Sequence, residues 1–199
     1  MGKNRRILIS VTDKTGLEKF KCLTDIGYQI ISTGGTKVAL ENAKIPVTAI
    51  EDITGFPEMM DGRVKTLHPK IAGGILAVRD NVKHMAQALE HNIEMIDIVV
   101  VNLYNFAANP DIEQIDIGGP TLIRAASKNG ISTIPIIDPD DYTWLIAEIA
   151  AIGAIPEIWR EKLVIKVFRR TGQYDIDIAD WMEDQQRQDK RFLRPALAA

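Results

Sequence analysis

The 199-residue sequence has a single cysteine, Cys22, and no apolar run that approaches the roughly 20 residues needed to cross a bilayer. A lone thiol cannot form an internal disulfide, so the composition favours a reducing, cytoplasmic compartment. The first six residues are basic but lead directly into a strand-like segment, which is not the pattern of a signal peptide. We therefore expect a protein with no membrane partner.

An excess of positive charge is also missing, because the formal net charge is −3. Nucleic-acid binders usually carry a basic stripe, so we expect no nucleic-acid partner, although a local pocket for one phosphate is compatible with this charge. His68, His84 and His91 lack the spacing of a metal site, and we expect no metal. The sequence contains neither a P-loop nor a GxGxxG fingerprint, so nothing calls for ATP or NAD.

Short β-rich segments alternate with helical ones over the first two-thirds of the chain. Strands are expected at Arg6–Val11, Tyr28–Ser32, Val47–Ile50, Asp97–Asn102 and Thr133–Ile137, with helices at Thr15–Ile26, Lys37–Ala43 and Pro120–Asn129. The unbroken run Ile98–Val101 suits a strand that is covered on both faces. The alternation predicts an α/β fold with a mainly parallel sheet of about five strands flanked by helices.

Three further helices are expected in the C-terminal third, at Tyr142–Ala151, Pro156–Phe168 and Gln173–Met182. The sequence after them is polar and charged. We expect residues 1–182 to form a single domain with a helical C-terminal extension, and residues 183–199 to form a frayed or disordered tail.

The turn after the first expected strand carries polar and cationic groups, because Thr12, Asp13 and Lys14 stand immediately before Thr15 and Gly16. Ligands of open parallel sheets bind beyond the carboxyl ends of the strands. Hydroxyls, a lysine and the amides of a helix N-terminus would form an anion site there. Ordinary helix capping by Thr12 or Asp13 explains the same residues equally well.

The second strand is followed by Thr33, Gly34, Gly35 and Thr36, again at the expected start of a helix. Paired glycines let backbone amides approach a phosphate closely, and Thr36 could both cap the helix and donate a hydrogen bond. A plain turn accounts for the glycines too. The recurrence of this chemistry at two neighbouring strand ends favours a phosphate site.

The long segment from Gly55 to Gly74 has few signs of regular structure and contains several cationic side chains, including Arg63 and Lys65, followed by Thr66. Long irregular segments in compact domains are usually functional or disordered. Disorder is disfavoured by apolar side chains that we expect to be buried, namely Phe56, Met59, Met60, Leu67 and Ile71. An active-site loop that presents Arg63 and Lys65 is preferred over a solvated face.

Two later segments contain further candidate site residues. Asn102 and Tyr104 follow the fourth strand, and Asp116 and Ile117 precede the helix that contains Thr121, Arg124 and Lys128 on one face. That face could be exposed to solvent. If it looks into a pocket with Asp116, its cations would lower the pKa of Lys128 and allow proton transfer near neutral pH.

These segments together resemble the inosine monophosphate (IMP) cyclohydrolase domain of the bifunctional purine-biosynthesis enzyme. The resemblance extends from about Arg6 to Trp181. Its motifs are TGFPEMMDGRVKTLHPKI (Thr54–Ile71), ISVTDKTG, IISTGGT, VVVNLY, IDIGGPTLIRAASKN and TGQYD. The resemblance implies a methylglyoxal-synthase-like fold. It also implies closure of the purine ring of 5-formamidoimidazole-4-carboxamide ribotide, with loss of water and without a cofactor.

The resemblance also assigns roles to individual positions. Lys128 corresponds to the proton-transferring lysine, Asp116 to the group that orients or deprotonates the carboxamide, and Lys65, supported by Tyr104, to the group that stabilises the oxyanion. The positions that correspond to nucleotide contacts are Thr12, Asp13, Lys14, Thr33, Gly34, Gly35, Thr36, Arg63, Thr66, Asn102 and Ile117.

The sequence departs from the family pattern in several places. The family's transformylase domain does not follow in these 199 residues, so we expect a separate formyltransferase to supply the substrate; a homodimer is expected by analogy. Histidines of the family are replaced by Ala72, Gly130 and Arg170, Asn105 stands in place of a proline, and the segment 107–113 is short. A nucleotide-binding regulatory module is the alternative function. Methylglyoxal synthase shares the fold, but the GRVKTLHP and NLY motifs disfavour it.

Overall fold

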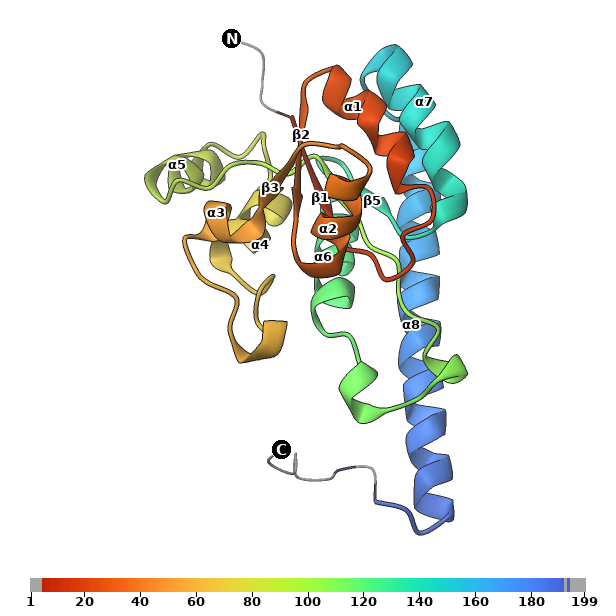
Figure 1. The fold of residues 1–199 in the computed structure, drawn as a ribbon. Helices are drawn as coiled ribbons and strands as arrows, with labels where there is room; N and C mark the ends of the chain where they lie inside the picture. Colours follow the sequence, from red (N-terminus) through yellow and green to blue (C-terminus); the bar gives the residue numbers. More distant parts are fainter. Residues whose placement is uncertain (1–4, 192, 194–199) are drawn as a thin grey trace.

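The computed structural model describes residues 5–191 and 193, and a single parallel sheet lies at its centre (Figure 1). The sheet has the order β3-β2-β1-β4-β5. Its strands are β1 (Arg5–Ile9), β2 (Tyr28–Ser32), β3 (Val47–Ala49), β4 (Ile98–Val100) and β5 (Ile134–Ile136). All four pairings are parallel, so the predicted α/β fold is confirmed.

The central strands are apolar on both faces because each face has its own core. Ile7 and Ile9 of β1 belong to one cluster of buried side chains, whereas Leu8 belongs to the other, and all three are 0% exposed. The side chains of a strand alternate between its two faces, so an unbroken apolar run fits a sheet that is covered on both sides.

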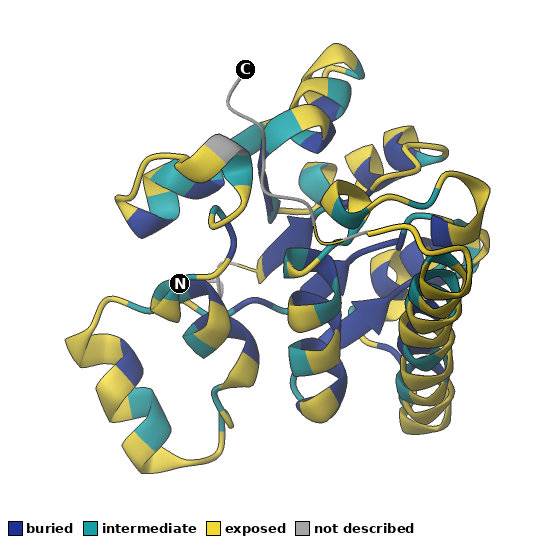
Figure 2. Cartoon of the chain, turned by 90° about the horizontal axis from the view of Figure 1, so that it is seen from below, coloured by how far each residue is buried: buried dark blue, intermediate teal, exposed yellow. Residues whose placement is uncertain are grey.

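Helices cover both faces of the sheet. One core takes side chains from η1 (Leu17–Phe20), α1 (Lys21–Asp25), α2 (Gly34–Asn42) and α7 (Tyr142–Ile152). The other takes them from α3 (Ile50–Thr54), α4 (Pro69–Leu76), α6 (Gly118–Lys128) and the middle of α8 (Glu157–Arg187). The remaining elements are α5 (Val82–Glu90), η2 (Met60–Gly62), η3 (Phe106–Ala108), η4 (Ile112–Gln114) and η5 (Pro139–Asp141). Figure 2 shows the buried strands surrounded by helices whose outer faces are exposed.

The C-terminal helix differs from the prediction. The two helices expected at Pro156–Phe168 and Gln173–Met182 form one continuous helix, α8, which also includes the first residues of the expected tail. Thr171, in the expected gap, and Tyr174, just after it, are buried, so packing keeps this part helical. Gly172, which alone disfavours a helix by about 1 kcal/mol, does not end it. The rest of the expected tail is described only for residues 188–191 and 193.

The 31 residues of α8 extend over about 46 Å. The helix packs along β5 and α6 and continues beyond the carboxyl ends of the strands (Figure 1). No helix in the described part of the chain combines the length and apolar character required to cross a bilayer.

The segment that follows α3 is less buried than its sequence predicts. Ile71 is buried, but Phe56, Met60 and Leu67 are 53%, 67% and 42% exposed. The expectation that these apolar side chains are buried is therefore wrong for most of them. Phe56, Met59 and Leu67 instead help to line a shallow cavity of about 310 Å³.

Removing apolar volume from either face of β1 should destabilise the domain strongly. Leu8→Ala and Ile9→Ala should each lower the free energy of unfolding by about 2–5 kcal/mol, because each truncation leaves a cavity in a different core. Urea unfolding followed by circular dichroism measures the effect. The matched control is Ile26→Ala, at a half-exposed position, which should change stability by less than about 0.5 kcal/mol. A small effect of either core substitution would contradict the two-core arrangement.

Candidate active site

The carboxyl ends of all five strands lie at one edge of the sheet, and most of the predicted site residues follow them. The chain runs outward from β1 to β3 on one side and from β4 to β5 on the other, so the strand order reverses between β1 and β4. Such a reversal opens a crevice between the connecting loops, which is the usual ligand site of open α/β sheets.

The turn after β2 forms a cationic cradle. Helix α2 begins at Gly34, three residues earlier than predicted, so Gly34 and Gly35 form its first turn. Gly34 has a φ of +52°, and a methyl group there would lie 3.0 Å from Lys65 Nζ. A methyl group on Gly35 would lie 3.7 Å from Lys14 Cε. Two lysines from different loops therefore approach the amides of a helix N-terminus, which suits a phosphate.

The threonines of this turn have structural roles as well. The Thr36 hydroxyl does not cap α2, as the sequence suggested, but donates to Val11 O and accepts from Val11 N. Thr33 is the N-cap residue, and its hydroxyl lies 3.4 Å from Glu51 Oε1. Both side chains are buried, so the bonds of Thr36 hold the cradle against the end of β1 and the contact of Thr33 ties it to α3.

The loop after β1 is held by Asn102, at the end of β4. Asn102 Oδ1 accepts hydrogen bonds from Thr12 N at 2.7 Å and Asp13 N at 3.0 Å, and its Nδ2 donates to Asp13 O at 2.7 Å. Asp13 Oδ1 accepts from Thr15 N, and the hydrogen bonds with Thr15 lower the pKa of Asp13. The 3₁₀ segment η1 follows and α1 begins only at Lys21, so this loop does not form the α-helix N-terminus that was expected.

Asp116 stands at the N-terminus of α6, where its carboxylate accepts a hydrogen bond from Gly119 N at 3.0 Å. Its backbone N–H donates to the hydroxyl of Tyr174, a residue of the TGQYD motif, at 2.9 Å. A methyl group at Gly119 would lie 2.3 Å from Asp116 Oδ2, and one at Gly118 would lie 2.7 Å from Thr66 Oγ1. The two glycines therefore allow the carboxylate and the threonine hydroxyl to approach the helix end.

A cavity of about 320 Å³ brings several of these groups together. It is lined by Lys65, Thr66, Asp116 and Ile117, with Arg63 at its rim in an ion pair with Glu113. Ser10 and Glu113 also line it and were not predicted, because neither carries a distinctive local pattern. The cavity joins a carboxylate, an ammonium group and a helix N-terminus, which can accept a proton and stabilise a developing negative charge.

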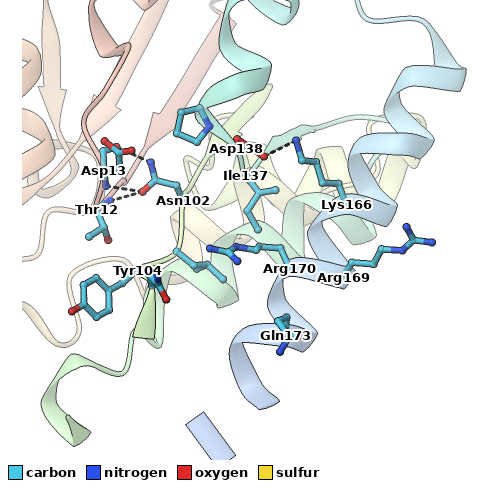
Figure 3. A pocket seen from close by; sticks show the side chains of 13 residues that line it. Thr12, Asp13, Asn102, Tyr104, Ile137, Asp138, Lys166, Arg169, Arg170 and Gln173 are labelled. Carbon is cyan, nitrogen blue, oxygen red and sulfur yellow. Dashed lines mark hydrogen bonds and ion pairs between the residues drawn. The ribbon is translucent and has the colours of Figure 1, made fainter. Parts of the chain in front are cut away.

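A second, larger cavity of about 680 Å³ lies between the strand ends and α8 (Figure 3). Of the predicted site residues it contains Thr12, Asp13, Asn102 and Tyr104, and the half-buried Tyr104 points away from α8 in Figure 3. The α8 residues in its wall were not predicted as site residues: Lys166, Arg169, Arg170 and Gln173. Their spacing of one helical turn was a signal in the sequence, and Arg170 had been noted only as a departure from the family pattern.

Lys128 lies apart from both cavities. It is exposed at the last residue of α6, and ten residues of helix, about 15 Å of rise, separate it from Gly118 beside Asp116. Because α6 returns the chain from the end of β4 to the start of β5, Lys128 is at the opposite edge of the sheet. Thr121 and Arg124 share its exposed face, and the Arg124 guanidinium lies 5.3 Å from the centre of the Phe168 ring.

No group of three or more His, Cys, Asp or Glu side chains within the described residues is arranged to hold a metal ion. The histidines instead make local contacts. His68 is the N-cap residue of α4, and His84 Nδ1 accepts from Val78 N.

An ion cluster closes one side of the larger cavity. Lys166 Nζ lies 2.8 Å from Asp138 Oδ2 and 2.7 Å from Asp141 Oδ2. Burial alone would raise the pKa of Asp138, but the hydrogen bonds from Lys166 and Asp140 N, with the charges of Lys166 and Arg170, hold it below its usual value. The cluster ties α8 to the segment after β5.

The cluster should make stability depend on pH. A lowered pKa of Asp138 contributes stability that is present above the unfolded value of about 3.9 and is lost as pH falls through the folded value. Lys166→Gln should cost about 1 kcal/mol at pH 7, since the pairs are partly exposed, and should reduce this acid-dependent loss. Urea unfolding at several pH values between 3 and 7 tests both effects.

The matched control is Lys21→Gln, which removes the more exposed pair with Asp25. It should cost at most about 0.5 kcal/mol. Equal effects of the two substitutions would indicate that the Lys166 cluster contributes no more than an ordinary surface pair.

A parallel α/β domain with cationic and amide groups at its carboxyl edge belongs to the class of small-ligand-binding domains. Residues 16–134 match the family model described as MGS-like domain, and the chain belongs to this family. Residues 126–197 match a second model, described as AICARFT/IMPCHase bienzyme.

The chain is similar to proteins named bifunctional purine biosynthesis protein PurH. It is 52% identical over 196 residues to that of Streptococcus suis (strain 05ZYH33), covering 94% of this chain and 38% of the relative. It is 51% identical over 191 residues to that of Streptococcus pneumoniae serotype 2, covering 91% and 37%. A solved structure titled "Crystal structure of ForH" superposes with a TM-score of 0.80 at 34% identity, covering 89% of this chain and 98% of that one.

Proposed function

We propose that the protein is an IMP cyclohydrolase. The observation that carries this proposal is the convergence of Lys65, Thr66 and Asp116 at the N-terminus of α6, beside the Gly34–Gly35 cradle. Supporting it, the chain is about half identical to the PurH proteins, of which it spans little more than a third.

The phosphate of the ribotide would bind at the start of α2. Lys14 lies beside the amides of Gly34 and Gly35 there, so charge and hydrogen bonds act on the same group. Asn102 holds the loop that carries Thr12 and Asp13 beside the ribotide. The base would then extend toward Asp116 in the smaller cavity.

Ring closure joins the carboxamide nitrogen of the substrate to its formyl carbon. Asp116 would accept a proton from this nitrogen as the C–N bond forms. Lys65 and the N-terminus of α6 would stabilise the oxygen of the tetrahedral intermediate. That oxygen leaves as water, with one proton from the carboxamide nitrogen and one from the formamido nitrogen. Both reacting groups belong to one molecule, so holding them in attack geometry supplies much of the rate.

The three positions at which the family carries histidine lie outside the smaller cavity. Ala72 is on α4, Gly130 follows α6, and Arg170 lines the larger cavity. These replacements therefore leave the contacts of Asp116 and Lys65 intact. A separate formyltransferase as the source of the substrate stays a prediction.

The role expected for Lys128 requires a second subunit, because in one chain this lysine is at the opposite edge of the sheet. We propose a homodimer in which Lys128 enters the site of the partner. An isologous dimer with antiparallel α8 helices would bring the α6 end of one subunit toward the strand ends of the other. The proton donor to the departing oxygen would then come from the second chain.

Helix α8 offers a surface for such a dimer. Ile158, Ile165, Phe168 and Ile176 are each 42–57% exposed and fall within one face of the helix. The Arg124 side chain over the Phe168 ring joins this stripe to the α6 face that carries Lys128. An apolar stripe continuous with the lysine supports the proposed contact.

Purified protein mixed with 5-formamidoimidazole-4-carboxamide ribotide should produce IMP without added metal or nucleotide, as measured by absorbance. Asp116→Asn and Lys65→Met should each lower kcat by about 10²–10⁴-fold, because they remove a base and an oxyanion partner. The control is Asp25→Asn, which neutralises an exposed carboxylate on α1. Absence of turnover together with tight IMP binding would favour a regulatory nucleotide-binding module instead.

Mixing two inactive variants tests the shared site. Lys128→Ala and Asp116→Asn subunits, co-refolded in equal amounts, should regain about a quarter of wild-type activity, because half of the dimers are hybrids with one complete site of two. The measurement is turnover of the mixture against each variant alone. A mixture that stays inactive, with hybrids verified by mass spectrometry, would refute the supply of Lys128 by the partner.

A further inference from the structure

The proposed ring closure takes place in the smaller cavity at Asp116. The larger cavity, between α8 and the strand ends, is not needed for that step. Its volume of about 680 Å³ is roughly twice that of the cavity at Asp116. One wall is formed by the residues after β1 and β4, including Thr12 and Asn102, and another by the segment Ile137–Pro139. Helix α8 forms the side opposite Asn102 (Figure 3).

The three cations that α8 contributes are in different situations. Lys166 is neutralised by Asp138 and Asp141. Arg169 is directed away from the cavity in Figure 3, whereas Arg170 extends into it toward the side of Asn102. Within the described residues, Arg170 makes no hydrogen bond or ion pair, and it acts on Asp138 only through its charge. Its guanidinium donors therefore have no protein acceptor among the described residues, although the residue is exposed.

Other polar groups surround the position that Arg170 approaches. The Thr12 side chain is exposed, and Asn105 and Gln173 also line the cavity. Of the two carboxylates in the wall, Asp138 is paired with Lys166 and Asp13 accepts from Thr15 N, so the Arg170 guanidinium keeps free donors for a planar or tetrahedral anion.

We propose that this cavity is a second anion-binding site, in which Arg170 holds the phosphate or carboxylate group of a small molecule. The site is distinct from the cradle at Gly34 and Gly35, since its cation comes from α8 rather than from Lys14 and Lys65. The cavity volume admits a small metabolite and exceeds the needs of an inorganic ion. Two anions therefore bind at one edge of the sheet, on opposite sides of the loop that carries Thr12 and Asp13.

The test follows the side-chain Nε–Hε signals of arginine by nuclear magnetic resonance in protein saturated with IMP. Inorganic phosphate is titrated in one arm and malonate in another, so that phosphate and carboxylate ligands are distinguished. We expect a saturable shift of the Arg170 signal in at least one arm. Arg170→Gln should raise the apparent Kd by about tenfold or more, as expected for loss of a charge-assisted hydrogen bond.

Arg187→Gln is the control, because it removes the same charge from an exposed position of the same helix that lines neither cavity. It should change the apparent Kd by less than about twofold, the effect of a screened surface charge. If the two substitutions changed the apparent Kd equally, the anion would be responding to the general surface charge and not to a specific site, and the proposal would be overturned.

Three other outcomes would also overturn it. Displacement of IMP by either anion would mean that the anions share the ribotide site, and absence of any saturable shift would mean that the cavity binds neither group. A shift obtained only with a poly-glutamate peptide would assign the cavity to a protein partner. Failure of IMP itself to bind would refute the proposed function, while the Arg170 signal would still report on the second site.

Discussion

The parallel pairing of β1 with both β2 and β4 is the constraint on which the rest of the structure depends. It places every strand's carboxyl end at one edge, and it requires crossover helices that cover both faces. Asn102 then joins the ends of β1 and β4 through three hydrogen bonds across about 90 positions of sequence. Thr36 joins the ends of β1 and β2 in the same way. The loops that carry the chemistry are thus held by buried polar contacts.

The glycines of the site matter chiefly because they have no side chain, which lets charged groups of other residues come close to the backbone. Gly119 admits the Asp116 carboxylate at a distance that a Cβ atom would forbid, and Gly34 leaves room for the Lys65 ammonium group beside it. Both glycines stand in the first turn of a helix, where unpaired backbone N–H groups carry partial positive charge. One helix end therefore suits the phosphate of a ribotide, and the other suits the negative charge that develops during ring closure.

The two ends of α6 separate the proposed catalytic groups. Asp116 is fixed at the first turn by Gly119 and Tyr174, whereas Lys128 is exposed at the last turn. A rigid helix cannot bring these ends together within one chain. The proposed dimer would remove this separation, and the exposed apolar stripe on α8 is the surface on which that proposal rests. Arg170 lines only the larger cavity, so the ring closure proposed in the smaller one does not require it.

The sequence by itself determined the α/β class, the strand positions to within one or two residues, and the turns that carry polar groups. These features follow from local periodicity and turn chemistry, which act over a few residues. The tertiary structure decided which groups meet: Lys65 with Gly34, Asp116 with Tyr174, and Arg170 with the strand ends. It also decided that α8 is continuous, since buried Thr171 and Tyr174 outweigh the local effect of Gly172, and that Lys128 lies apart. Such outcomes depend on contacts between residues distant in sequence, which no local pattern encodes.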